Sequence, residues 1–160
     1  MTEATRKRLS VRELGPNDLD ELISWRMEVL DTVFAEDKPW DAEALREANL
    51  GYYREHIGKD HFACIISVDG KDAGCGAICI QDEMPSPDNP TGKNAYLMNI
   101  YTREEFRHKG VGEAVVAWLI DRARAEGADK IYLESTDMAK SLYSKIGFAP
   151  MHGMMKLQNM

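Results

Sequence analysis

The chain has 160 residues, of which 44% are hydrophobic and 29% are charged, proportions that are typical of one globular domain with a full core. Acidic residues outnumber basic residues by 27 to 20, which gives a net charge of -7 at pH 7. This charge argues against general nucleic-acid binding, because that activity requires a basic surface. No apolar run approaches the length of a membrane span, and the first residues (MTEATRKRLSVREL) lack the apolar segment of a secretory signal. We therefore expect a cytoplasmic protein whose partners are neither nucleic acids nor membranes.

The first half of the chain combines strand patterns with two helical patterns. Pro16-Asn17-Asp18 offers a helix start, and apolar residues follow it at helical spacing. Pro39-Trp40-Asp41 ends this helix and can cap a second one, and Asp69-Gly70 is a strong signal for a two-residue turn between strands. The expected elements are strands at Arg8–Leu14, His61–Val68 and Lys71–Gln81, and helices at Leu19–Phe34 and Ala42–Ile57.

Three cysteines, Cys64, Cys75 and Cys79, occur without the spacing of a disulfide framework, which fits a reducing cytosol. Cys75 and Cys79 share strand parity and are placed to face Cys64 across the hairpin. A metal site would need more ligands than the neighbouring His61 supplies. We therefore expect buried core thiols and no metal site.

Two features of the returning strand and its exit leave alternatives open. Gly74 and Gly76 leave room on one face of the strand; a bulge or a close backbone neighbour explains them, and so does weak strand composition. Residues 82–94 (DEMPSPDNPTGKN) are polar and hold three of the six prolines, so we expect a long loop. A loop of this kind is either functional or an exposed, mobile connection.

The second half of the chain begins with a strand, Ala95–Tyr101, and an amphipathic helix, Val111–Glu126. Gly127 ends that helix. The remaining expected elements are a strand at Lys130–Glu134, a helix at Met138–Ile146 with an N-cap from Ser135, Thr136 and Asp137, and a last hairpin of Phe148–Met151 and Met154–Leu157. The resulting order, β-α-α-β-β-β-α-β-α-β-β, predicts one mixed α/β (α+β-like) domain over residues 1–160, with a central mixed sheet and helices on both faces.

The turn before that amphipathic helix, residues 107–112 (RHKGVG), has the features of an anion site. The N–H groups at a helix start lack intrahelical partners, and the helix dipole places partial positive charge there. Glycines let a phosphate approach the backbone closely. A dinucleotide fingerprint would need a third glycine where Val115 stands, and a P-loop sequence is absent. The turn indicates a pyrophosphate site, although a plain tight loop is the simpler interpretation of the hexapeptide by itself.

Two motifs resemble signatures of the GCN5-related N-acetyltransferase (GNAT) family. Residues 100–112 (IYTREEFRHKGVG) are similar to its motif A, in which Arg/Gln-x-x-Gly-x-Gly/Ala follows a strand. Residues 139–148 (AKSLYSKIGF) are similar to its second signature, Ala-x-x-Leu-Tyr-x-x-x-Gly-Phe. The detailed resemblance covers Ala95 to Phe148, and the order of the preceding elements also fits.

The resemblance implies that acetyl-CoA is the co-substrate and that no metal takes part. In the family the pantetheine arm binds the backbone of the strand before motif A, and the pyrophosphate meets the N–H groups of the turn. Arg107 and Lys109 would add charge there, unless they are simply solvated surface cations. The implied donor-binding residues are Ile100, Tyr101, Thr102, Arg107, His108, Lys109, Gly110, Val111, Gly112, Glu113, Thr136 and Ser141.

The resemblance also implies a catalytic acid, Tyr143, the tyrosine of the Leu-Tyr pair. A phenol with a pKa of about 10 suits protonation of a thiolate leaving group. Tyr143 also lies on an apolar helical stripe, so packing is the alternative role.

The sequence departs from the family pattern at two places. Many members have Asn where this chain has Thr136, and many place a Glu on the motif-A strand, which has none here. The candidate bases are Glu134, Glu83 and a water held by Asn99, and each carboxylate is also explained as a surface charge.

The function that the resemblance implies is transfer of an acetyl group from the CoA thioester to an amine of a small molecule or peptide. The alternative is a non-catalytic acyl-CoA-binding or regulatory module on the same fold. Three segments are candidates to line the acceptor entry: Glu36–Asp41, Asp82–Asn94 and the turn at His152-Gly153. Their acidic excess would attract a cationic amine or merely keep the protein soluble. The sequence leaves open the acceptor, the length of the acyl group and the oligomeric state, a homodimer included.

Overall fold

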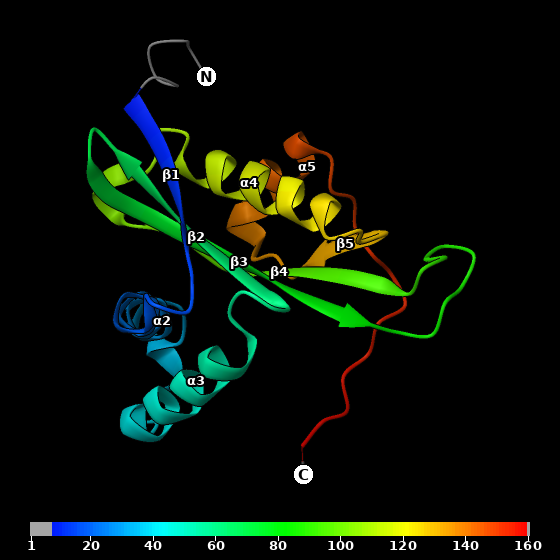
Figure 1. The fold of residues 1–160 in the computed structure, drawn as a ribbon, viewed down its shortest axis with the longest axis horizontal. Coiled ribbons are helices and arrows are strands. Elements are labelled where there is room, and N and C mark those ends of the chain that lie inside the picture. The colour runs from blue at the N-terminus through cyan, green and yellow to red at the C-terminus, as the bar shows by residue number, and fades with distance from the viewer. Residues whose placement is uncertain (1–7, 160) are drawn as a thin grey trace.

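A computed structural model describes residues 8–159 and places one β-sheet between two pairs of helices (Figure 1). Residues 1–7 and 160 of the predicted domain lie outside the described part. The strands are β1 (Leu9–Leu14), β2 (His61–Val68), β3 (Lys71–Asp82), β4 (Lys93–Thr102) and β5 (Lys130–Leu133). The α-helices are α2 (Leu19–Val33), α3 (Ala42–His56), α4 (Val111–Ala125) and α5 (Lys140–Ile146), and short 3₁₀ helices are η1 (Ala35–Asp37), η2 (Glu104–Phe106) and η3 (Asp137–Ala139).

The strands form one sheet in the order β1-β2-β3-β4-β5. The first four are antiparallel neighbours, whereas β5 runs parallel to β4. A parallel pair requires a long crossover connection, and helix α4 supplies it. The structure therefore confirms a mixed sheet with helices on both of its faces.

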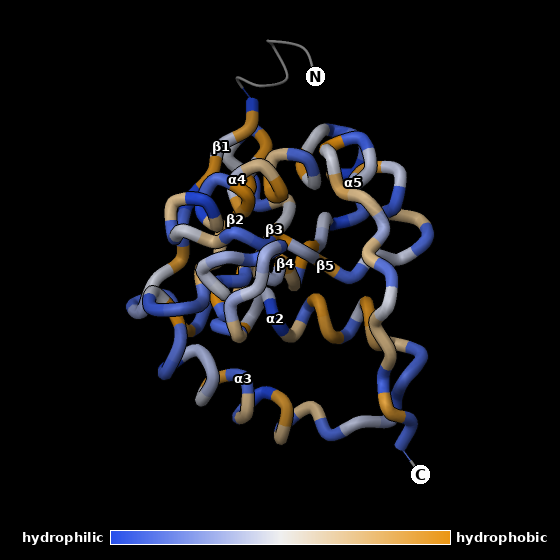
Figure 2. Tube along the Cα trace, turned by 90° about the vertical axis from the view of Figure 1, so that its right-hand side faces the viewer, coloured by the Kyte–Doolittle hydropathy of each residue, from blue (hydrophilic) through white to orange (hydrophobic). Residues whose placement is uncertain are grey.

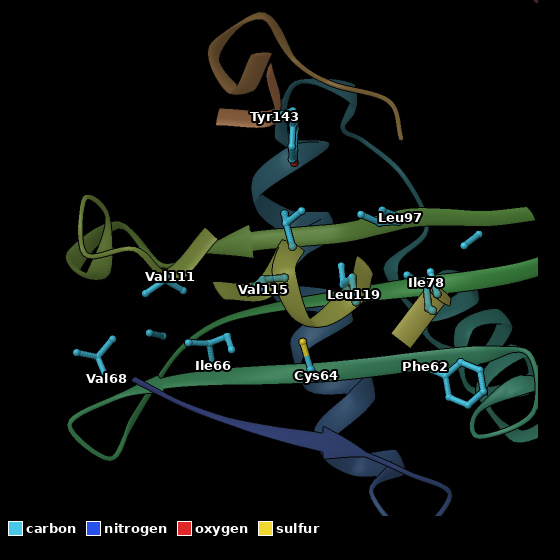
Figure 3. Packing of buried hydrophobic residues seen from close by; sticks show 14 residues of the cluster. Phe62, Cys64, Ile66, Val68, Ile78, Leu97, Val111, Val115, Leu119 and Tyr143 are labelled. Carbon is cyan, nitrogen blue, oxygen red and sulfur yellow. The ribbon is translucent and has the colours of Figure 1, made fainter. Parts of the chain in front are cut away.

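Each face of the sheet has its own apolar core, because successive side chains of a strand point to opposite faces. Cys64 and Val115 belong to the core that α4 and α5 cover (Figure 3), and Ile65 and Trp25 belong to the core that α2 covers with α3. Figure 2 shows the two helix pairs on opposite sides of the strands. Since both faces are covered, β2 is buried along its whole length, as its continuous apolar run indicates.

Gly74 and Gly76 allow α4 to lie directly on β3. A Cβ atom added to Gly74 would lie 2.7 Å from both Val111 Cγ1 and the carbonyl oxygen of Tyr101, and one added to Gly76 would overlap Val115. The register between β3 and β4 also shifts at Gly76. Both the close neighbour and the bulge that the sequence allowed are thus present.

The predicted loop between β3 and β4 is held by internal hydrogen bonds. The Glu83 N–H donates to the Gly92 carbonyl (2.7 Å), and the buried Asn89 side chain donates to Glu83 Oε1 (2.9 Å). The Thr91 hydroxyl donates to Asp129 Oδ2 (2.7 Å), which ties the loop to the start of β5. These bonds favour an ordered loop over a mobile connection.

The predicted last hairpin, Phe148–Met151 and Met154–Leu157, is wrong, because no strand follows α5 up to residue 159. Pro150 lies inside the first predicted strand and has no N–H for a ladder. Met154 and Leu157 are 70% and 91% exposed, so nothing covers their apolar side chains. A two-stranded hairpin without a packed face is only marginally stable. The observed order of strands and α-helices is therefore β-α-α-β-β-β-α-β-α.

The predicted arrangement of the cysteines is wrong in one respect. Cys64 pairs with Gly76, and Cys75 pairs with Ile65, so Cys64 and Cys75 lie on opposite faces of the sheet. Cys79 lies on the same face as Cys75. All three thiols are free and buried, which confirms the expectation of core thiols.

Helix α5 begins later than predicted, at Lys140, because the 3₁₀ helix η3 precedes it. Ser135, Thr136 and Asp137 give neither helix a side-chain cap bond. The Ser135 hydroxyl instead donates to the carbonyl of Thr136 (2.7 Å). The N-cap prediction is therefore wrong, since these side chains serve a turn rather than the helix start.

We predict that Gly76→Ala lowers the free energy of unfolding by about 1–3 kcal/mol, because the added methyl group overpacks the contact with Val115 and Leu119. The urea midpoint would measure the loss. Gly51→Ala is the matched control: nothing lies within 4 Å of its added Cβ in α3, and its helix propensity improves by up to about 1 kcal/mol. Equal midpoints for the two variants would contradict the close-packing argument.

Candidate active site

Strands β4 and β5 run together and then separate. Their pairing ends where Leu97 faces Leu133, the last residue of β5, while β4 continues to Thr102. Within residues 8–159, the rest of β4 has no strand partner on its β5 side. Such an edge can bind an extended ligand as an added strand. Ile100, Tyr101 and Thr102, all predicted to contact the donor, lie on this edge.

A β-bulge in β4 accounts for the separation. The register shift opposite Gly76 coincides with a left-handed backbone at Asn99, which has φ 55°. A bulge bends its strand and increases the local twist, so β4 turns away from β5. Arg26 of α2 donates through Nη1 to Asn99 Oδ1 (2.8 Å) and so ties α2 to the bulge.

The turn after β4 has the unpaired N–H groups that an anion site requires. His108 and Gly110 have positive φ values of 64° and 80°, and α4 begins directly afterwards. The N–H of Ala114 donates to the carbonyl of Gly110 (3.0 Å), so the N–H groups of residues 111–113 precede the first bond of the helix. They belong to Val111, Gly112 and Glu113, three of the residues that the sequence predicted to bind acetyl-CoA.

The basic side chains of the same turn are available for an anion. Arg107, His108 and Lys109 are exposed, and none of them forms an ion pair with a residue between 8 and 159. Their charge therefore adds to the partial charge of the helix N-terminus.

The two sequence motifs meet at Gly112. A Cβ atom there would lie 3.2 Å from Leu142 Cδ2 in α5 and 4.0 Å from Thr102 Oγ1 in β4. The open edge of β4, the start of α4 and helix α5 therefore converge, and a larger residue than glycine would narrow the space between them.

Tyr143 comes next to Leu142 in α5 and is 8% exposed. Its ring lies edge-on to Phe148 with the centroids 6.0 Å apart, and its hydroxyl end points toward β4 (Figure 3). Burial raises the pKa of this phenol, which keeps it protonated at neutral pH. The residue both packs in the core and presents a proton donor.

The other predicted site residues lie around α5. Glu134 is exposed after the end of β5 and shares with Tyr143 the lining of a cavity of about 590 Å³. Burial, with the charge of Glu134, raises the pKa of Tyr96, so the carboxylate is near that phenol. Thr136 and Ser141 are exposed, one before η3 and one in the first turn of α5.

A second cavity, of about 400 Å³, lies on the opposite face of the sheet, and the sequence did not reveal it. Its lining comes from α2, α3 and three strands. The residues are Arg26, Ala48, Asn49, Tyr52, His61, Cys79, Gln81, Tyr96, Met98 and Asn99. The available signal was a row of polar and aromatic residues on one face, because His61, Cys79 and Tyr96 are direct cross-strand partners.

His61 is the centre of a polar cluster in this cavity. The Tyr52 hydroxyl lies 2.9 Å from His61 Nδ1 and 3.2 Å from Cys79 Sγ. Burial, and then the charge of Arg26, lower the pKa of His61 to about 4, so its ring is neutral at pH 7. His61 Nε2 is buried and has no hydrogen-bond partner in the described part of the chain.

Two kinds of feature are absent from residues 8–159. No group of three or more His, Cys, Asp or Glu side chains is arranged to hold a metal ion. No described helix is both long enough and apolar enough to cross a membrane.

A family model described as the acetyltransferase (GNAT) family matches residues 19–148. The chain belongs to the GNAT family. This match confirms the resemblance that the two motifs indicated and extends it to the helices that precede the hairpin. It covers both the open edge of β4 and the second cavity.

Known GNAT proteins are similar to the chain at low sequence identity. A glucosamine 6-phosphate N-acetyltransferase of Arabidopsis thaliana is 29% identical over 94 residues, which cover 58% of this chain and only 61% of that protein. A GCN5-related N-acetyltransferase of Ralstonia eutropha JMP134 shares the fold at 22% identity, with a TM-score of 0.76 over 94% of this chain and 98% of the other. A predicted acetyltransferase of Clostridium acetobutylicum, solved with acetyl-CoA, does so at 20% identity and a TM-score of 0.76, over 94% and 96%.

We predict that Gly112→Asp abolishes the rise in Tm that acetyl-CoA produces in the wild-type protein. The new carboxylate would repel a pyrophosphate, and its side chain would project toward Leu142 and Thr102. Tm with and without acetyl-CoA measures binding, because a ligand of the folded state stabilises it. Gly51→Asp adds the same charge to an open position in α3 and should keep the full rise. If both variants responded equally, the turn would not be part of the donor site.

Proposed function

We propose that this GNAT protein transfers the acetyl group of acetyl-CoA to the amine of a small molecule or peptide. One observation carries the proposal: within the described residues, the edge of β4 that has no strand partner leads directly into a turn with unpaired N–H groups. A pantetheine arm that ends in a pyrophosphate matches both parts, because the arm needs a backbone edge and the phosphates need an anion site. The Clostridium neighbour, solved with acetyl-CoA, supports the same donor.

The donor-binding residues have different roles in this proposal. The backbone of Ile100, Tyr101 and Thr102 binds the arm, and the N–H groups of residues 108–113 bind the pyrophosphate. Arg107 and Lys109 supply charge, while Thr136 and Ser141 contact the arm from the α5 side. Holding the thioester in place in this way converts a bimolecular reaction into one between oriented groups.

Tyr143 is the proposed general acid. The amine nitrogen forms a bond to the thioester carbonyl carbon, and the carbon–sulfur bond then breaks with its electron pair on sulfur. The Tyr143 hydroxyl gives its proton to that thiolate. Burial raises the pKa of the phenol, so Tyr143 carries a proton at neutral pH that it can donate, and the same shift makes it a weaker acid than an exposed tyrosine.

Glu134 is the proposed base that takes the proton from the attacking amine, directly or through water. Glu83 is a poorer candidate: Asn89 donates to its carboxylate and Lys130 lies 3.5 Å away, and both hold its pKa below the usual range. A water held by Asn99 is the remaining candidate, and it would bind the amide nitrogen, since Arg26 already occupies the amide oxygen.

The relatives favour a small molecule over a peptide as the acceptor, because the Arabidopsis protein acts on glucosamine 6-phosphate. A cytoplasmic location and a homodimer remain predictions from the sequence.

We expect the purified protein to release free thiol from acetyl-CoA when it is given a panel of small amines and short peptides. The release should depend on the amine, and the acetylated product should appear in equal amount by mass spectrometry. Donor binding without any amine-dependent thiol release would support the non-catalytic acyl-CoA-binding module instead.

We predict that Tyr143→Phe lowers kcat by about 10²-fold, the range expected for loss of a general acid, while the Tm rise with acetyl-CoA is retained. Phenylalanine preserves the ring contact with Phe148, so packing alone would leave kcat unchanged. Steady-state rates and melting curves on the same preparation separate the two roles. Wild-type kcat in the variant would assign Tyr143 to packing.

A further inference from the structure

The cavity of about 400 Å³ between α2, α3 and the sheet has a positive charge and no carboxylate in its lining. Arg26 is the charged residue, and the other polar lining residues are the amides Asn49, Gln81 and Asn99, with the neutral His61. The acidic residues of Glu36–Asp41 and Asp82–Asn94, which favoured a cationic amine in the sequence, are absent from this lining.

Arg26 lacks the counter-ion that other arginines of the sheet region have. Arg12 pairs with Asp72 (2.8 Å) and Arg103 with Glu28 (2.9 Å), whereas Arg26 forms no ion pair with any residue from 8 to 159. A guanidinium group that is partly buried without a carboxylate is suited to bind an anion.

Two neutral amides hold the guanidinium in place. Arg26 Nε donates to Asn49 Oδ1 (3.1 Å), and Nη1 donates to Asn99 Oδ1 (2.8 Å). An arginine has five N–H donors, so these bonds leave donors on both terminal nitrogens. His61, whose buried Nε2 has no hydrogen-bond partner among the described residues, lines the same cavity.

The position of the cavity relates it to the donor. Asn99 is both the partner of Arg26 and the bulge residue at which β4 leaves β5. A molecule whose anionic group binds Arg26 can therefore extend its other end along β4 toward the open edge of that strand. A volume of about 400 Å³ suits a molecule of the size of an amino sugar or an amino acid.

We propose that this cavity binds the acceptor and that Arg26 recognises a carboxylate or phosphate group that the acceptor carries beside its amine. The proposal rests on the acetyl-transfer function above and gives it a substrate class. The acceptor proposed here differs from the cationic one that the acidic loops suggested, because the positive charge of Arg26 would repel a second cationic group on the acceptor.

Paired acceptors test the proposal. Thiol release would be measured for glucosamine 6-phosphate against glucosamine, for 4-aminobutyrate against butylamine, and for spermidine as a cation. We expect kcat/KM to favour the anionic member of at least one pair by roughly tenfold or more, the range of one charge-assisted hydrogen-bonded contact. The pair that shows the preference identifies the anion as phosphate or carboxylate.

Variants assign the preference to Arg26. Arg26→Gln should remove it by raising KM for the anionic acceptor, with little change for the neutral one, and Arg26→Lys should restore part of it. A purely structural role at the bulge would lower kcat/KM for both members equally and leave the ratio unchanged. Arg46→Gln, on the exposed face of α3 outside the cavity, is the matched control and should keep the ratio.

The outcomes separate this inference from the proposed function. Thiol release that shows no anion preference, or that favours spermidine, would overturn the role of Arg26 and leave acetyl transfer intact. If no amine were turned over, calorimetry on the CoA-loaded protein would decide: tighter binding of the anionic members, lost in Arg26→Gln, supports the site, and equal affinities overturn it. A protein that also failed to bind acetyl-CoA would overturn both proposals.

Discussion

The bulge at Asn99 is the constraint on which both the open edge of β4 and the second cavity depend. It lies opposite Gly76, where the lack of a side chain lets α4 pack onto β3 while β4 changes its register. Beyond the bulge β4 no longer pairs with β5, so one strand edge has no partner strand in the part of the chain that the structure describes. On the other face, the hydrogen bond from Arg26 holds the same residue against α2. One irregular residue in a strand thus shapes the open edge and a wall of the second cavity.

The parts of the fold and site that follow from neighbouring residues could be predicted from the sequence. The strand predicted at His61–Val68 matches β2, because two apolar faces within one short run leave few alternatives to a central strand. The turn before α4 could be predicted as well. A glycine with positive φ and a helix start are local features, so Gly110 and the N–H groups after it are encoded within six residues.

The parts that depend on distant segments could not be predicted. The cavity around Arg26 takes its walls from five elements, and no local pattern shows that a helical arginine will meet an asparagine in β4. The opposite placement of Cys64 and Cys75 depends on the strand register, which one residue of slip would reverse. The last hairpin failed for the same reason: two short segments around His152-Gly153 suggested strands, but Met154 and Leu157 have no surface among the described residues to cover them.

The open edge of β4 and the second cavity adjoin the same strand, and this geometry bears on whether the reaction needs one chemical step or two. A donor on the edge of β4 and an acceptor beside Arg26 would not cover each other's route of entry, so both could be held at once. The cysteines are poorly suited to carry the acetyl group from the donor to the acceptor as a thioester. Burial raises the pKa of Cys64 to about 12 and also raises the pKa of Cys79, so neither thiol readily forms the nucleophilic thiolate. The proposed reaction is therefore a single displacement within a ternary complex, with no covalent acetyl-enzyme along the way.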